Sequence, residues 1–246
     1  SQPAEEIPVH TVNIDEAALD KYGQFPFPRD IYANIIKELY ERNAGLVVFN
    51  VLMPEQDRFK QDPVLAKLLE KYPVILPQIA STKGKNKTFG SAVQPVGRDP
   101  QGAFVDYPGI IANVPILEER AAGTGIVNTF PEIDGVVRRM PLLITSGDTI
   151  HPALALETLK IAAGDNRIQV KITDMGVEAL RIPKLNRINV DPLSRVWIDW
   201  SQTPKEHSLV NLPKDFNGEI VIVGLSAAGL IKARYVVSSK IEKQRL

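Results

Sequence analysis

Gly45-Leu46-Val47-Val48-Phe49-Asn50-Val51-Leu52 is the stretch that decides the fold of this 246-residue chain. From Leu46 to Leu52 it forms an almost continuous apolar run that is rich in valine. Such a run is typical of a strand buried on both faces, as the strands of parallel sheets are. The sequence therefore predicts a parallel sheet with this strand in its interior.

Helices and strands alternate on both sides of this stretch. Upstream, His10–Ile14 has the β-branched and apolar content of a strand. A helix is predicted after Phe25-Pro26-Phe27-Pro28-Arg29-Asp30, because apolar residues recur at helical spacing from Ile31 to Leu39 and Asp30 is a suitable N-cap. Downstream, Asp62-Pro63 opens a second helix. A short buried strand follows at Pro73–Pro77, and this alternation predicts right-handed crossovers around a parallel sheet.

The second half of the chain mixes the two signals. We predict strands at Ala122–Thr129, Val136–Ile144 and Ile220–Gly224, and turns at Glu132–Gly135, which contains Asp134-Gly135, and at Ser146-Gly147-Asp148. A helix is predicted from His151-Pro152 to Gly164, and short strands over residues 168 to 200. No linker rich in serine, glycine and proline divides the sequence. The expected fold is one α/β domain with a mixed, largely parallel central sheet, flanking helices and antiparallel additions.

The composition excludes several classes of protein. Lysine plus arginine and aspartate plus glutamate both total 29, so no global basic field is available to hold a nucleic acid. Cysteine is absent, which removes thiol nucleophiles, disulfides, thiolate zinc sites and iron–sulfur clusters. The three histidines, His10, His151 and His207, have no ligand-like spacing. We therefore expect no metal and no cofactor.

Known catalytic motifs and membrane spans are also missing from the sequence. There is no Gly-x-Ser-x-Gly elbow, no Walker loop and no His-Glu-x-x-His helix. Gly224–Gly229 follows a buried strand but lacks the second glycine of a dinucleotide fingerprint, so we expect close packing there. The most apolar stretches, Gly45–Met53 and Ile220–Leu230, are shorter than the ~18–20 residues that a helix needs to cross a bilayer.

Two charged pairs are the candidate polar sites. Asp15-Glu16 follows the first strand, and adjacent residues on an extended chain point in opposite directions. We therefore expect a helix cap or a solvated turn there, and no shared acid–base site. Alternation likewise predicts that one of Arg138 and Arg139 faces the packed side of its strand. A buried guanidinium needs an acidic or carbonyl partner, so we expect an internal salt bridge with Asp15, Asp134 or a similar acid, ahead of ligand binding.

Several blocks in a fixed order, from about Val9 to about Gly229, resemble the type-2 CHASE family. This family comprises bacterial extracellular sensory domains associated with cyclases and histidine kinases. The matching blocks are Asn13-Ile14-Asp15-Glu16, Phe25-Pro26-Phe27-Pro28-Arg29, Gly45–Leu52, Gly125-Ile126-Val127-Asn128, Asp134-Gly135-Val136-Val137-Arg138-Arg139-Met140-Pro141-Leu142, His151-Pro152-Ala153-Leu154-Ala155-Leu156-Glu157 and Ile220-Val221-Ile222-Val223-Gly224.

The chain departs from the family pattern at two places. Asn50 stands where the family usually has aspartate. The stretch Leu230–Arg234 lacks the acidic residue and the Thr-Pro pair expected there. If an acidic site involves these positions, this chain has altered it.

The resemblance implies an extracytoplasmic sensory domain of a bacterial membrane receptor, without catalytic activity of its own. Residues 1–8 and 231–246 would then connect to membrane helices, and residues 9–230 would form the domain. A cytoplasmic cyclase, diguanylate cyclase or kinase would follow, and such outputs usually work as homodimers. The stimulus, a small molecule or a protein, is not identified by the resemblance. The residues that match the blocks and are expected to bind ligand or to signal are Asp15, Arg29, Asn50, Asn128, Asp134, Arg138 and Arg139.

Two other functions remain open on the sequence alone. One is a soluble α/β hydrolase or transferase, which needs polar residues clustered at the carboxyl ends of its strands. The other is an envelope module that binds a partner protein. Turnover of generic substrates separates the first from a sensor, and a pull-down separates the second.

Overall fold

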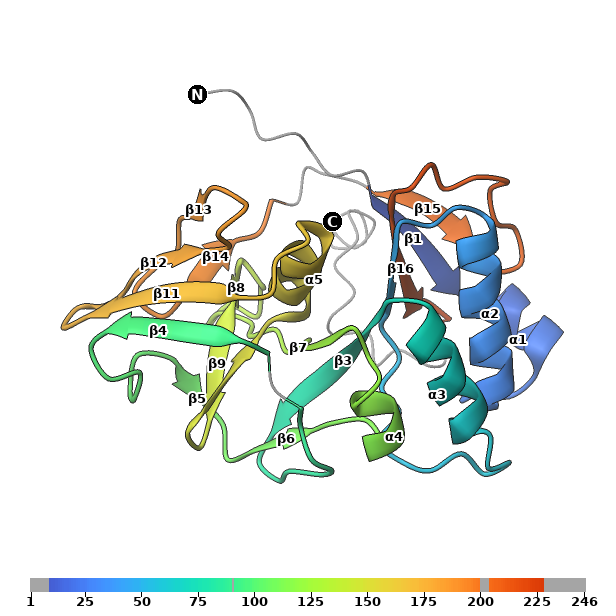
Figure 1. The fold of residues 1–246 in the computed structure, drawn as a ribbon, viewed down its shortest axis with the longest axis horizontal. Coiled ribbons are helices and arrows are strands. Elements are labelled where there is room, and N and C mark those ends of the chain that lie inside the picture. Colours follow the sequence, from blue (N-terminus) through green and yellow to red (C-terminus); the bar gives the residue numbers. More distant parts are fainter. Residues whose placement is uncertain (1–8, 90, 200–203, 228–246) are drawn as a thin grey trace.

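The computed structural model describes residues 9–89, 91–199 and 204–227 (Figure 1). The predicted connectors at residues 1–8 and 231–246 lie outside the described residues, as do Leu230–Arg234 and the part of the Gly224–Gly229 segment beyond Ala227. The described residues form a mixed α/β structure with five helices and several sheets. The predicted fold class is therefore confirmed.

The central sheet has seven strands in the order β15-β1-β16-β2-β3-β6, with β7 also paired to β3. All of its pairings are parallel except that of β3 with β6. The last strand in sequence, β16, is inserted between β1 and β2, the first two. The strands are β1 (Val9–Ile14), β2 (Leu46–Phe49), β3 (Val74–Ser81), β6 (Gly109–Ile111), β7 (Gly123–Ile126), β15 (Lys205–Ser208) and β16 (Ile220–Leu225).

Helices cover both faces of this sheet, which explains why the inner strand β2 is apolar throughout. One face packs against α1 (Glu16–Tyr22), α2 (Arg29–Glu41), α3 (Asp62–Lys71) and the short α4 (Pro115–Glu118). The other face packs against α5 (Leu154–Ala162). In β2, Val47 and Phe49 enter the first core, whereas Leu46 and Val48 enter the second. The predicted strand buried on both faces is confirmed.

A second group of strands, which we call the β-rich lobe, packs around a separate core at the opposite end of the molecule from α2 (Figure 1). It contains sheets of the order β10-β9-β5, β13-β12-β11-β4 and β14-β8. The strands are β4 (Val93–Gly97), β5 (Val105–Asp106), β8 (Arg139–Pro141), β9 (Leu143–Ser146), β10 (Thr149–Pro152), β11 (Ile168–Thr173), β12 (Gly176–Arg181), β13 (Arg187–Ile188) and β14 (Arg195–Trp197).

Helix α5 joins the two cores. Leu154 and Ile161 pack with the central sheet, whereas Leu156 and Leu159 pack in the core of the β-rich lobe. The contact with β7 is close, because a Cβ added at Gly125 would lie 2.4 Å from the Cα of Leu154. Only a glycine allows the helix to approach the sheet to this distance.

Three local predictions were wrong. The first large helix begins at Arg29 and not after Asp30, because Pro28 takes the cap position, where its fixed φ suits a helix start. His151 and Pro152 end strand β10 and do not open a helix, since His151 pairs with Ile144 of β9.

The third wrong prediction is the single strand at Val136–Ile144. It is divided at Leu142 into β8 and β9. The backbone N–H of Leu142 donates to the carbonyl of Ser194, 2.9 Å away. Strand β8 then pairs with β14, and β9 pairs with β5 and β10. Different partners on either side of Leu142 therefore break the strand.

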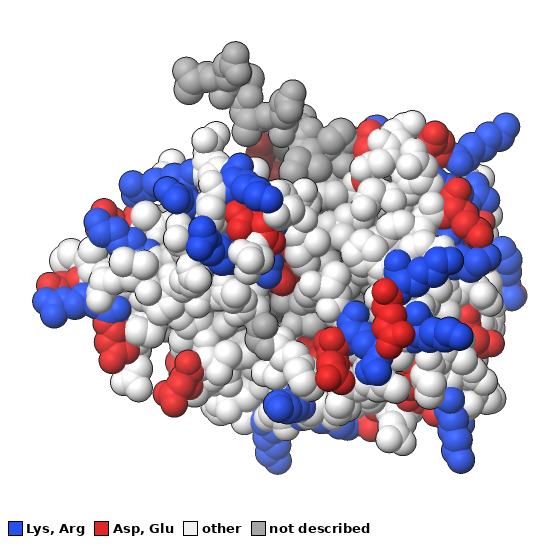
Figure 2. Space-filling model, in the orientation of Figure 1, with Lys and Arg blue, Asp and Glu red and all other residues white. Residues whose placement is uncertain are grey.

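Among the described residues, no helix is long and apolar enough to cross a bilayer, and no group of three or more histidine or acidic side chains could hold a metal ion. Acidic and basic side chains are interspersed on the face shown in Figure 2. This mixture agrees with the balanced net charge of the sequence.

Candidate functional site

A tight turn from Glu132 to Arg138 forms the first part of the candidate site. The N–H of Gly135 donates to the carbonyl of Glu132 over 2.8 Å, and the N–H of Glu132 donates to the carbonyl of Val136 over 2.9 Å. Gly135 has a φ of 80°, a left-handed conformation that a residue with a side chain rarely adopts. The Asp-Gly turn predicted from the sequence is confirmed, and it brings the side chains of Asp134 and Arg138 together.

Arg138 binds Asp134 with two hydrogen bonds. Its two terminal nitrogens lie 2.9 and 2.6 Å from the two carboxylate oxygens. A third, longer contact of 3.3 Å joins Arg138 to Glu132. The hydrogen bonds from Arg138 lower the pKa of Asp134 to about 2. Arg138 therefore pairs with Asp134, one of the acids predicted, but the pair lies at the surface and not in the interior, and Asp15 takes no part in it.

Arg139 links the turn to a distant segment of the chain. Its Nε donates to Glu132 over 2.9 Å, and a terminal nitrogen lies 3.5 Å from Asp191. Asp191 also accepts from the Nε of Arg195 at 2.7 Å. The pairing of β8 with β14 places Arg139 opposite Trp197, and its guanidinium lies 5.2 Å from the centre of the indole ring.

These contacts form one chain of alternating charge, which we call the arginine network. Its members, in order of contact, are Asp134, Arg138, Glu132, Arg139, Asp191 and Arg195. Because three guanidinium groups meet three carboxylates, the formal charges cancel. The network is partly solvated, so each pair contributes little to stability by itself.

The arginine network borders an open hollow of about 640 Å³. Apolar side chains, including Val105, Phe130 and Pro141, complete the lining. Phe130 stacks on Tyr107 with the ring centres 5.7 Å apart. Guanidinium groups beside aromatic and apolar surface suit a planar anionic group such as a carboxylate, which they bind in a bidentate manner.

Neither Arg138 nor Arg139 points into the core, so the prediction from strand alternation was wrong. Their side chains are 39% and 27% exposed. Strand β8 begins only at Arg139, and Arg138 still belongs to the turn. The alternation rule therefore does not apply across this pair.

Arg29 occupies a different place, at the beginning of α2. It is 5% exposed, and its Nε donates to Asp62 over 3.0 Å. A terminal nitrogen donates to the carbonyl of Glu55 over 2.9 Å. The second oxygen of Asp62 accepts from the N–H of Asp57 at 2.8 Å. This buried ion pair ties the start of α2 to the start of α3, on the opposite side of the molecule from β8 (Figure 1).

The other three predicted residues each follow a strand of the central sheet. Asp15 caps α1 by accepting from the N–H of Ala18 at 3.0 Å, so the predicted helix cap is confirmed. Asn50 is exposed after β2. The side-chain amide of Asn128 binds the N–H and the carbonyl of Ala80 at 2.7 and 2.9 Å, which extends the pairing of β7 with β3. The structure therefore brings together only Asp134, Arg138 and Arg139.

Sequence reasoning missed the partners of the arginines. Asp191 and Arg195 lie more than 50 positions from Arg139 in the sequence, and no local pattern marks them. It also missed a buried polar group around Glu118, which is 2% exposed. Its carboxylate accepts from Gln78 and from the backbone and side chain of Asn113. Burial raises the pKa of Glu118 despite these hydrogen bonds.

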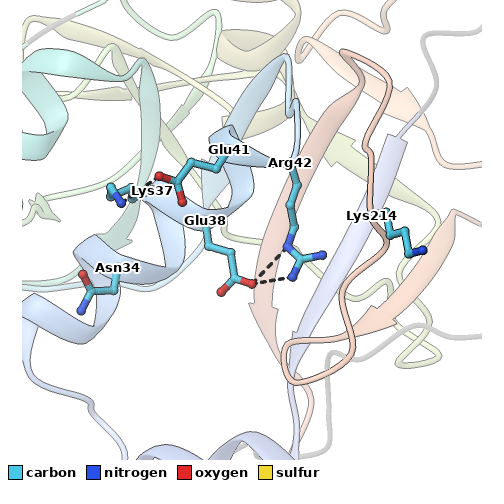
Figure 3. A pocket seen from close by; sticks show the side chains of 6 residues that line it. All are labelled: Asn34, Lys37, Glu38, Glu41, Arg42 and Lys214. Carbon is cyan, nitrogen blue, oxygen red and sulfur yellow. Dashed lines mark hydrogen bonds and ion pairs between the residues drawn. The ribbon is translucent and has the colours of Figure 1, made fainter.

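A shallow hollow beside α2 is a weaker candidate (Figure 3). Its charged groups bind one another: Lys37 pairs with Glu41, and Arg42 pairs with Glu38. Figure 3 shows Glu38 and Arg42 facing each other, with Lys214 set apart from them. Arg42 also donates to the carbonyl of Pro213 over 2.8 Å. We infer that Arg42 has a structural role, because it links the end of α2 to the segment that follows β15.

The comparison with known families decides the identity of the domain. The family model of the CHASE2 domain matches residues 1–242. The chain belongs to the CHASE2 family. No curated protein and no solved structure matches the chain. CHASE2 domains are extracellular sensory domains.

Proposed function

We propose that this CHASE2 domain is the extracytoplasmic part of a bacterial transmembrane receptor. It passes a conformational signal through flanking membrane helices to a cytoplasmic output module such as a cyclase, diguanylate cyclase or histidine kinase. The match to the family over residues 1–242 supports the sensory role. Because such output modules work as pairs, the receptor is expected to be a homodimer.

The arginine network is the proposed responsive region, and its geometry is the observation that carries this assignment. Glu132 binds both Arg138 and Arg139, and Asp191 binds both Arg139 and Arg195. An anionic group that enters the hollow competes with these carboxylates for the same guanidinium groups. A stimulus shifts a receptor only if it binds two states of the domain with different affinity. Exchange of partners around Arg139 supplies two such states.

Charge reversal at Arg139 tests this assignment in the full-length receptor. In Arg139→Glu, a carboxylate replaces the guanidinium between Glu132 and Asp191, so we expect the basal or stimulated output to change severalfold. Because these side chains are partly exposed, the free energy of unfolding should fall by only about 1 kcal/mol.

Arg98→Glu is the matched control, since Arg98 also pairs with an aspartate, Asp174, but is 67% exposed and lies outside the network. It should leave the output unchanged. An Arg139→Glu receptor with unaltered output and stability would overturn the assignment.

A further inference from the structure

Two histidines that are 197 positions apart in the sequence meet at the edge of the central sheet. His10 lies on β1 and His207 on the edge strand β15, which pairs with β1 in parallel. The Nδ1 of His10 lies 2.8 Å from the Nε2 of His207, and the two rings are stacked with their centres 5.1 Å apart. His10 is only 4% exposed. We call this contact the histidine pair.

One acidic and one basic residue face the histidine pair. Glu219, which immediately precedes β16, is in ion-pair contact with the Nε2 of His10, although without the geometry of a hydrogen bond. Lys205 on β15 lies 3.2 Å from the same carboxylate. The ring of Phe216 packs edge-on against both histidines, with ring centres 5.1 and 6.0 Å away.

Other charged groups on the neighbouring elements have partners of their own. Arg42, at the end of α2, binds Glu38 and the carbonyl of Pro213. Asp215, in the segment between β15 and β16, binds the side chain of Asn43. Within the part of the chain that the structure describes, Glu219 and Lys205 are therefore the charged groups that act directly on the histidine pair.

The 2.8 Å separation between the two facing nitrogens leaves room for one hydrogen-bonding proton and not for two. One imidazole must donate an N–H while the other accepts with a lone pair. If both rings are imidazolium cations, both facing nitrogens carry a proton, so two N–H groups point at each other and two positive charges lie in contact. A single carboxylate, Glu219, cannot neutralise both, and the adjacent Lys205 adds a third positive charge.

Strand β15 is short and lies at the edge of the central sheet. It spans only Lys205–Ser208, and β1 is its one strand partner among the described residues. Lys205 and Glu206 on this strand are exposed. The histidine pair joins the side chains of β15 and β1, beside the backbone pairing of the two strands.

We propose that acidification releases β15 from β1 by placing a second proton on the His10–His207 pair. This makes the histidine pair a proton-sensitive latch at the first strand of the sheet. The inference goes beyond the proposed receptor function and does not depend on it, because it concerns a change within this domain alone.

The pKa of His207 is shifted in the direction that this geometry requires, because folding disfavours its protonated form. Burial lowers the pKa of His207, and the charges of His10 and Lys205 lower it further. A histidine whose pKa is depressed by folding binds its proton more readily once its surroundings open. The stability contributed by the closed latch is therefore complete above the ordinary histidine pKa of 6.5 and is lost as the pH falls below it.

Hydrogen exchange measured by mass spectrometry at pH 7.5 and 5.5 tests the latch in this chain, after correction for the intrinsic exchange rates. The protection of the β15 amides should fall on acidification by up to about tenfold per pH unit, the limit for one linked proton. The amides of β2, in the middle of the sheet, should keep their protection. In His207→Gln, β15 should show the same protection at both pH values.

His151→Gln is the matched control, because burial also lowers the pKa of His151 but this residue lies on β10 in the β-rich lobe. This variant should keep the acid response of β15. An unchanged β15 in the wild type, or an equal fall of protection in His207→Gln, would overturn the proposal.

A second measurement uses the wild-type chain, so it does not require that a variant folds. Nuclear magnetic resonance of the imidazole nitrogens follows protonation of His207 in the wild-type chain. Its ring should take up a proton over the pH range in which β15 loses protection. Loss of protection while the ring stays neutral would refute the latch. Neither experiment uses a receptor output, so failure of the latch leaves the proposed function untouched.

Discussion

Replacement of Arg29 by methionine tests whether this arginine stabilises the fold, in contrast to Arg138 in the proposed responsive region. Arg29 and Asp62 form an ion pair whose side chains are 6% and 10% exposed. Methionine fills a similar volume, but among the described residues it leaves the N–H of Asp57 as the one hydrogen-bond donor to the buried carboxylate of Asp62. The variant therefore creates an uncompensated buried charge at the junction of α2 and α3.

The expected loss in the free energy of unfolding is large for a single substitution, because the substituted side chain is buried. Removal of one partner from a buried ion pair costs about 3–5 kcal/mol, a substantial part of the ~5–15 kcal/mol that stabilises a typical domain. The lost hydrogen bond to the carbonyl of Glu55 acts in the same direction. With a urea m-value of about 2–3 kcal/mol/M, the unfolding midpoint should shift by about 1–2.5 M.

Arg138→Met is the matched control for this experiment. Arg138 also binds an aspartate with two hydrogen bonds, but its side chain is 39% exposed and that of Asp134 is 51% exposed. An exposed pair contributes about 0.2–1 kcal/mol, so the midpoint should move by less than about 0.5 M. Urea unfolding followed by far-ultraviolet circular dichroism measures both variants. Equal midpoints for the two variants would refute the reasoning that burial sets the value of the Arg29 pair.

Two further substitutions test the packing and polar interior of the domain. Glu118→Gln should lower the free energy of unfolding by about 1–3 kcal/mol. The reason is that the new amide N–H₂ faces the donors of Asn113 and Gln78. Urea unfolding measures this change, and a stability equal to that of the wild type would contradict the prediction. Since burial raises the pKa of Glu118, wild-type stability should also fall as the pH rises above about 4.5, and this slope should disappear in the variant. Gly125→Ala should cost about 1–3 kcal/mol or more, because its Cβ meets the backbone of α5. Gly224→Ala, with open space around the new Cβ and an ordinary φ, should cost less by the same assay.

Part of the fold was predictable because some local sequence patterns are stable only in one kind of structural environment. An uninterrupted apolar run such as Leu46–Phe49 can be stable only where both faces are covered. Asp15 follows a strand and precedes a helix, where its side chain serves as a cap. The Asp-Gly pair at 134 and 135 requires a turn with a positive φ. Each of these is a local requirement, so neighbouring residues reveal it.

The candidate site was only partly predictable for the same reason. The blocks that resemble the family contain Asp134, Arg138 and Arg139, and these lie together in one turn. Arg29 belongs to another such block but serves a buried junction far from that turn. Order along the chain therefore indicated the family, but it did not indicate which of the matching residues share a site.

By itself, the sequence determined the α/β class, the buried strands, the CHASE2 resemblance and the lack of any cysteine-based chemistry. Only the tertiary structure decided that β16 enters between β1 and β2, that Asp191 completes the arginine network and that His10 meets His207. The physical reason is that hydrophobic periodicity reports how deeply each segment is buried, whereas strand order and ion pairs depend on which distant segments pack beside it.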